Sequence, residues 1–179
     1  EAIKPYRTSA AELLLAAVTK TLSSETSNSP LILDMEGHGR EELFDDVDVS
    51  RTVGWFTSLF PLVFEAPQEQ DCQSWIIAAK EQSRAVPNRG VGYGILKWLA
   101  EEKVRSQLPI VQTVFNYLGS FDQIMPEDSL LGEATESVVS LYDPQNVRPH
   151  KWEINAYVRQ GRLCIEWNYS SSIDSEPEM

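Results

Sequence analysis

Several features are scarce in this chain of 179 residues, and each scarcity excludes a class of protein. Lys and Arg total 15 against 27 Asp and Glu, which leaves a net charge of −12, whereas binding to a nucleic acid rewards the opposite sign. The longest apolar run, residues 13–18, is far shorter than the roughly 20 residues that cross a bilayer. We therefore expect no nucleic-acid partner, no membrane insertion and a cytoplasmic location.

Cysteine and histidine are also rare. Cys72 and Cys164 are far apart and lack any CxxC or Cys/His spacing, so we expect buried free thiols rather than a disulfide or a metal site. Nothing resembles a signal peptide. Because the chain begins with Glu1 rather than Met, we expect it to be a piece of a larger protein.

The apolar patterns that are present predict one domain. A capping box at Ser9 and Glu12 predicts the start of a helix, and Asp71 predicts the cap of another. Helices are predicted over residues 9–22, 71–83 and 95–104, and strands over 31–36, 54–65 and 110–119. Pro61 predicts an edge or a bulge in the second strand because proline has no N–H to donate. This order predicts an α/β (α+β) fold, a mixed β-sheet with flanking helices.

The C-terminal part predicts a β-hairpin. Residues 151–159 and 162–169 flank the dipeptide Gln160-Gly161, which is typical of a two-residue turn. Pairing Arg159 with Arg162 brings the apolar side chains of both strands to one face, so the pattern determines the register.

The stretch LDMEGHGREE ends the first predicted strand in a carboxylate. Strand alternation places Met35 on the apolar face and Glu36 on the opposite face. Gly37 and Gly39 allow a sharp turn or a close approach of the backbone. We interpret His38, between the two glycines, as a turn residue and only secondarily as a chemical group.

Two charged segments need interpretation. Asp45, Asp46 and Asp48 lack the glycine and glutamate of an EF-hand, so we expect a solvated loop rather than a cation site. The glycine-rich segment 87–94 lacks the GK[ST] ending of a phosphate loop. Residues 80–105 carry six basic side chains against three acidic ones and are a candidate contact for an acidic protein partner.

Four segments in order resemble the motifs of epimerization domains from nonribosomal peptide synthetases. They are EGHGREE (36–42), DVDVSRTVGWFTSLFPLVF (46–64), PNRGVGYG (87–94) and FNYLGSFD (115–122). The similarity extends from about Tyr6 to Tyr169. It implies that residues 1–179 form a single chloramphenicol-acetyltransferase-like lobe, the C-terminal half of a two-lobed domain. The other lobe would carry a catalytic histidine in an HHxxxDG motif, which this chain lacks, so we expect the fragment alone to be inactive.

The resemblance also implies a reaction. It is the L-to-D epimerization of the α-carbon of an aminoacyl or peptidyl thioester, held on the 4′-phosphopantetheine arm of a peptidyl carrier protein. The chain itself would bind no cofactor and no metal. Its expected partners are the carrier protein, for which the basic segment 80–105 is a candidate contact, the missing N-terminal lobe and neighbouring synthetase domains.

The resemblance assigns site residues as well. Glu36 would transfer a proton on one side of the substrate, and the histidine of the missing lobe would act on the other. Arg40 would orient Glu36 or an acidic partner, or else form a surface ion pair with Glu41 or Glu42. Asn116 and Tyr117 would face the active channel, or Tyr117 would pack in the sheet core. Because neighbours in a strand alternate faces, at most one of these two can point into the channel.

Two other functions fit the same pattern. A condensation domain forms peptide bonds on the same fold, and a lobe without turnover would still dock a carrier protein. The segments EGHGRE, VGWFTSLFP and FNYLG favour epimerization over condensation.

Overall fold

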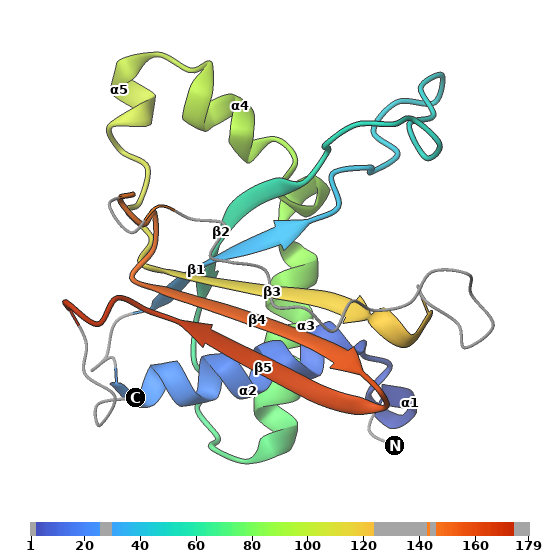
Figure 1. Cartoon of the computed structure of the whole chain (residues 1–179), viewed down its shortest axis with the longest axis vertical. Coiled ribbons are helices and arrows are strands. Elements are labelled where there is room, and N and C mark those ends of the chain that lie inside the picture. Colours follow the sequence, from blue (N-terminus) through green and yellow to red (C-terminus); the bar gives the residue numbers. More distant parts are fainter. Residues whose placement is uncertain (1–2, 26–29, 124–142, 144–145, 174–179) are drawn as a thin grey trace.

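The computed structural model describes residues 3–25, 30–123, 143 and 146–173 (Figure 1). The helices are α1 (Ile3–Tyr6), α2 (Ala10–Glu25), α3 (Cys72–Ala85), α4 (Tyr93–Trp98) and α5 (Glu102–Arg105), with 3₁₀ turns at Pro87–Gly90 and Phe121–Gln123. The strands are β1 (Leu31–Gly37), β2 (Ser58–Phe64), β3 (Thr113–Ser120), β4 (Trp152–Arg159) and β5 (Arg162–Asn168). Within the described part, none of the helices has the length and apolar character needed to cross a membrane.

The five strands form one mixed sheet in the order β2-β1-β3-β4-β5. β1 runs antiparallel to β2 and parallel to β3, β3 is parallel to β4, and β4 is antiparallel to β5. This sheet with flanking helices confirms the predicted fold class. β2 is an edge strand, as Pro61 predicted, because a proline at an edge removes no ladder bond on the outer side.

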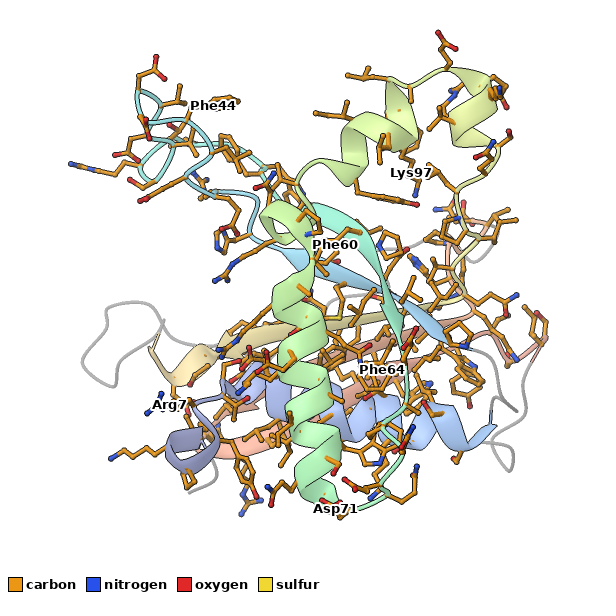
Figure 2. The ribbon with its side chains drawn as sticks, turned by 180° about the vertical axis from the view of Figure 1, so that it is seen from behind. Arg7, Phe44, Phe60, Phe64, Asp71 and Lys97 are labelled. Atoms are coloured by element: carbon orange, nitrogen blue, oxygen red, sulfur yellow. The ribbon has the colours of Figure 1, made fainter. Side chains whose placement is uncertain are left out.

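α2 and α3 cover the same face of the sheet in both views (Figures 1 and 2). Apolar side chains of the sheet and of the two helices are buried between them. They include Leu33, Phe115 and Ile154 of the strands, with Leu15 of α2 and Trp75 of α3. Burying each such side chain stabilises the fold by about 1.5–3 kcal/mol. The apolar residues that alternate along β1 and those that recur along α2 are thus buried in the same core.

Both predicted N-caps are present. The Ser9 amide donates to Glu12 Oε2 at 2.8 Å and the Glu12 amide donates to Ser9 Oγ at 3.2 Å, which completes the capping box. The Ser74 amide donates to Asp71 Oδ1 at 2.9 Å at the start of α3. Local sequence therefore determines where these two helices begin.

Glu12 also joins α2 to α3 through an ion pair. Arg84 Nε donates to Glu12 Oε1 at 2.6 Å. Burial raises the pKa of Glu12, but hydrogen bonds from Arg84, Thr8 and Ser9 outweigh burial and bring this pKa to about 2. The pair fixes the ends of the two helices that pack on the sheet.

The predicted hairpin has the expected register, with Arg159 opposite Arg162 and Ala156 opposite Ile165. Gln160 and Gly161 have φ of 52° and 66°, the left-handed values of a two-residue hairpin turn. Ile165 on the edge strand is nevertheless 55% exposed, because the core beneath the sheet does not extend under all of β5.

Three predictions about local structure were wrong. The predicted helix 95–104 is divided into α4 and α5, which are short and mostly exposed, so little packing stabilises one continuous helix. The second strand begins at Ser58 rather than at residue 54. The thiols are not buried: Cys72 is exposed in the first turn of α3 and Cys164 is half-buried on β5, on the face opposite Ile165.

Two segments project from the same end of the sheet (Figure 1). Residues 38–57, between β1 and β2, form the loop arm, which carries Phe44; residues 91–110, with α4 and α5, form the helical arm, which carries Lys97 (Figure 2). Both arms begin beside the C-terminal end of β1, where Glu36 lies.

Candidate functional site

The face of the sheet opposite α2 and α3 carries polar side chains from three adjacent strands. We call it the polar face, and its members are Asp34 and Glu36 of β1, Asn116 of β3, and Glu153 and Asn155 of β4. Asp34 is paired in register with Val114, and Asn116 with Asn155. Since side chains alternate along each strand, this register brings all five residues to one side.

Glu36 is bound directly by Asn116. Asn116 Nδ2 donates to Glu36 Oε2 at 2.6 Å, between residues 80 positions apart in the chain. Desolvation raises the pKa of Glu36, repulsion by Glu153 raises it further, and the positive charge of His150 lowers it. The net effect is a raised pKa, so this carboxylate takes up a proton more readily than an ordinary glutamate does.

Asp34, on the same face as Glu36, forms a close pair with a histidine. His150 Nε2 lies 2.8 Å from Asp34 Oδ2, and the two side chains are only 10% and 7% exposed. Sequence reasoning missed this pair, although alternation already placed Asp34 on the face of Glu36. Nothing local signals a contact between residues 116 positions apart.

The third group of the polar face is centred on Glu153. Asn155 Nδ2 donates to Glu153 Oε1 at 3.0 Å, and Arg148 Nη2 lies 3.6 Å from Glu153 Oε2. Across the sheet, each of the three carboxylates thus has a nitrogen partner. Asp34 also acts on Tyr93 at the start of α4, where burial and then the Asp34 charge raise the pKa of the Tyr93 phenol.

Tyr117 lies on the other face of β3 from Asn116. It is half-buried and packs against the core with Phe115, so the structure does not bring it to Glu36. The physical reason is the alternation of neighbours in a regular strand. Of the two residues predicted from FNYLG, only Asn116 lies in the site.

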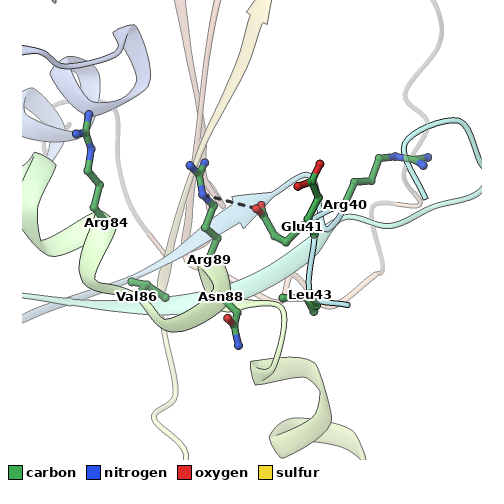
Figure 3. Close-up of a pocket in the computed structure, with 8 residues that line it drawn as sticks. Arg40, Glu41, Leu43, Arg84, Val86, Asn88 and Arg89 are labelled. Atoms are coloured by element: carbon green, nitrogen blue, oxygen red, sulfur yellow. Dashed lines mark ion pairs between the residues drawn. The ribbon is translucent and has the colours of Figure 1, made fainter. Parts of the chain in front are cut away.

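The Arg40 side chain points toward the loop arm (Figure 3). Its guanidinium donates to the carbonyl oxygens of Val49 and Gly54 and stacks over the Phe56 ring at 4.2 Å from the ring centroid. Neither predicted contact, to Glu36 or to the neighbouring glutamates, is present among the described residues. Arg40 instead holds the loop arm in shape.

His38 is a turn residue in the structure. Its Nδ1 accepts from the Arg40 amide at 3.0 Å, and its Nε2 lies 3.2 Å from Glu41 Oε1. Glu41 also pairs with Arg89 at 3.7 Å beside an open pocket of about 510 Å³ (Figure 3). These contacts place His38 in the junction between the arms, away from the polar face.

In the part of the chain that the structure describes, the acidic segment holds no metal site and most of the basic segment is paired within the chain. No cluster of three or more His, Cys, Asp or Glu suited to a metal ion occurs among the described residues. Four of the six basic side chains in residues 80–105 form ion pairs within the chain, namely Lys80–Glu81, Arg84–Glu12, Arg89–Glu41 and Arg105–Glu102. The contact with a carrier protein stays a prediction.

Comparison with known proteins decides the family. The model of the Condensation domain family matches residues 1–179. The chain belongs to the condensation-domain family. Bacitracin synthase 3 from Bacillus licheniformis is 37% identical over 179 residues, which are 98% of this chain and 3% of that protein. Gramicidin S synthase 1 from Brevibacillus brevis is 34% identical over 178 residues, which are 93% of this chain and 16% of that protein.

Solved structures of the condensation-domain family agree with this assignment. The crystal structure of the epimerization domain from the third module of tyrocidine synthetase B superposes with a TM-score of 0.77 at 30% identity and covers 94% of this chain. The first condensation domain of the CDA synthetase has a TM-score of 0.58 at 12% identity, a similarity of fold alone. The chain spans 38% of that epimerization domain and a much smaller share of the synthetases.

Proposed function

We propose that this chain is the C-terminal lobe of an epimerization domain and that Glu36 transfers the α-proton of an aminoacyl or peptidyl thioester. The thioester would be carried on the 4′-phosphopantetheine of a peptidyl carrier protein. The observation that supports this proposal is the contact of 2.6 Å between Asn116 and Glu36, which joins the first residue of EGHGREE to the second residue of FNYLGSFD. The similarity to a solved epimerization domain supports the same reaction.

The geometry of Glu36 suits a general base. Asn116 holds Oε2, and Oε1 has no hydrogen bond among the described residues, which leaves that oxygen for the substrate. Removing the α-proton next to a thioester carbonyl leaves an enolate, and returning a proton to the opposite face inverts the centre. A carboxylate with a raised pKa binds the proton more readily than an ordinary one, and such a base contributes about 10²–10⁴-fold in rate.

The second proton-transfer group would come from the other lobe. Inversion needs a group on each side of the planar enolate, while Glu36 and the rest of the polar face approach from one side only. The resemblance to epimerization domains assigns the second role to the histidine of an HHxxxDG motif, and neither His38 nor His150 lies in such a motif. The remaining partners would be neighbouring domains of the synthetase.

The experiment is an exchange assay with the full-length synthetase that contains this chain. With an L-aminoacyl carrier in deuterated water, we expect deuterium at the α-position and the D isomer as product. Glu36→Gln keeps the size and the contact with Asn116 but cannot take up a proton, so exchange should fall by about 10²-fold or more. Glu42→Gln, an exposed glutamate of the same stretch, is the matched control and should exchange like the wild type.

Condensation is the second candidate function, because the matching family model is that of condensation domains. The same assay separates the two reactions. Formation of a peptide bond without deuterium at the α-position would favour condensation, and normal exchange by Glu36→Gln would remove Glu36 from the mechanism.

A further inference from the structure

β5 is an outer edge of the sheet, and it lacks the features that normally protect an edge (Figure 1). It is hydrogen-bonded to β4 on one side, and in the described part of the chain no strand pairs with its other side. Its seven residues pair with β4 without a bulge, and they include neither proline nor lysine. The opposite edge strand, β2, carries Pro61 in its centre. Because a regular, exposed edge accepts a further strand, β5 is the edge that is open to pairing.

The side chains of β5 that face the helices are only partly covered. Leu163 and Ile165 are 52% and 55% exposed, whereas Ile154 and Ala156 of the neighbouring strand β4 are each 1% exposed. The core therefore ends beneath β4, and two aliphatic side chains continue it without cover. Another strand beside β5 would remove part of this apolar surface from water, which is favourable.

The backbone groups of these same two residues point outward. The two-residue turn at 160–161 closes with a hydrogen bond between Arg159 and Arg162, which are paired in register. Hydrogen-bonded and non-hydrogen-bonded pairs alternate along an antiparallel ladder. The N–H and C=O groups of Leu163 and Ile165 therefore point away from β4, toward the open edge.

The sequence of β5 is complementary to itself in the antiparallel direction. When Cys164 lies opposite Cys164 of a second copy, Arg162 lies opposite Glu166 and Leu163 lies opposite Ile165. Each of the last two pairs occurs twice, once at each end of the contact. Opposite charges and apolar pairs stabilise adjacent strands. This register also brings the outward-pointing backbone groups of both copies together as hydrogen-bonded pairs.

Neighbouring registers lack the charge complementarity. With Ile165 opposite itself, Arg162 faces Asn168 of the other copy. With Leu163 opposite itself, Arg162 faces Cys164. Neither register contains an ion pair, so the charges select the register centred on Cys164.

We propose that β5 pairs with β5 of a second copy of this chain, antiparallel and in the register centred on Cys164. The two sheets then form one continuous sheet about a two-fold axis, and each copy offers the same surface to the other. An interface of one short strand from each copy is small, so the dimer is weak and depends on concentration. The inference does not depend on the role of Glu36.

Sedimentation of the full-length synthetase at increasing concentration measures this dimer. We expect the average mass to rise toward that of two copies. Ile165→Lys places a charge in the centre of the edge, as protected edges do, and should weaken the dimer about tenfold or more. Ile77→Lys is the matched control. Ile77 is 41% exposed on α3, which packs against β2 at the opposite edge of the sheet, so this variant should sediment like the wild type.

Reversing the charges tests the register. Arg162→Glu places like charges opposite each other at both ends of the contact and should weaken the dimer about tenfold. Arg162→Glu combined with Glu166→Arg restores opposite charges across the two copies and should recover the association of the wild type. A partner other than a second copy would keep its own charges, so this double variant would not rescue it.

Cys164 provides a measurement that needs no substitution. Non-hydrogen-bonded pairs have Cα atoms about 4.5 Å apart, within the range of about 4.4–6.8 Å that a disulfide spans. Diamide oxidises two thiols to a disulfide and itself takes up their two electrons and two protons. We expect mass spectrometry to find Cys164 linked to Cys164 of a second copy severalfold more often than Cys72 linked to Cys72, although Cys72 is the more exposed thiol.

Three results would overturn the inference. One is the mass of a single copy at every concentration, or Cys164 linked to itself no more often than Cys72. Another is a dimer that Ile165→Lys and Arg162→Glu leave unchanged, because its contact would then lie elsewhere. The third is a double variant that associates no better than Arg162→Glu alone, which would exclude the proposed pairing of Arg162 with Glu166.

Discussion

Gly39, the second glycine of EGHGR, occupies a backbone position that excludes any other residue. Its φ is +66°, and a Cβ built there would lie 1.6 Å from the carbonyl oxygen of Phe56. The loop arm therefore returns directly over this glycine, and Arg40 next to it binds the carbonyls of the same arm. Such a position combines left-handed backbone with a close approach, and both favour glycine.

Gly39→Ala should displace the loop arm from β1. We expect the free energy of unfolding of the 179-residue chain to fall by about 1–3 kcal/mol, measured by urea titration. Amide hydrogen exchange of residues 40–56 should rise at the same time. Gly92→Ala is the control, because nothing lies within 4 Å of a Cβ at Gly92, and this change should leave both measurements near the wild type.

At the scale of secondary-structure elements, one carboxylate joins two turns. It lies in the 3₁₀ turn that follows β3 and binds the turn between β4 and β5. Asp122 Oδ1 accepts from the Gln160 amide at 2.6 Å, and Asp122 Oδ2 accepts from the Gly161 amide at 2.8 Å. The last residue of FNYLGSFD is thus a cap on a turn 38 residues away. This contact orients β4, which carries Glu153 of the polar face.

Asp122→Ala should loosen this turn without unfolding the sheet. A hydrogen bond contributes about 0.5–1.5 kcal/mol net, so we expect the amides of Gln160 and Gly161 to exchange roughly tenfold faster. Hydrogen exchange with mass spectrometry of the peptide that contains the turn measures this. Asp46→Ala, on the exposed loop arm, should leave the exchange of that peptide unchanged, and an equal rise in both variants would contradict the assignment.

For the whole molecule, the two arms expose large apolar side chains. Trp55 on the loop arm is 92% exposed, and Trp98 and Leu99 on the helical arm are 70% and 80% exposed. Apolar surface of this size on neighbouring projections commonly marks an interface. The chain spans 38% of the solved epimerization domain that it resembles. We therefore predict that the rest of such a domain packs against these exposed side chains.

Hydroxyl-radical footprinting tests this coverage. In the isolated 179-residue chain, we expect Trp55 and Trp98 to be oxidised readily, and in the full-length synthetase we expect severalfold less oxidation of both. Trp75, which is 3% exposed in the core, is the internal control and should be protected in both proteins. Equal oxidation of Trp55 and Trp98 in the two proteins would show that the arms face solvent.

Sequence by itself determined the features that depend on neighbours along the chain. The caps at Ser9 and Asp71, the register of Arg159 with Arg162 and the face of Glu36 all follow from spacings of a few residues. The same local logic failed for residues 95–104, because a helical pattern without a packing partner does not produce one continuous helix.

Only the tertiary structure decided which distant residues meet on the polar face. The parallel pairings of β1 with β3 and of β3 with β4 bring Asn116 to Glu36 and place His150 against Asp34. The chain pattern specifies which way each side chain points from its own strand, but not which strand lies beside it. Strand order depends on how the whole core packs, and for that reason the face of the carboxylate was predictable from the chain pattern, whereas its contact with Asn116 was not.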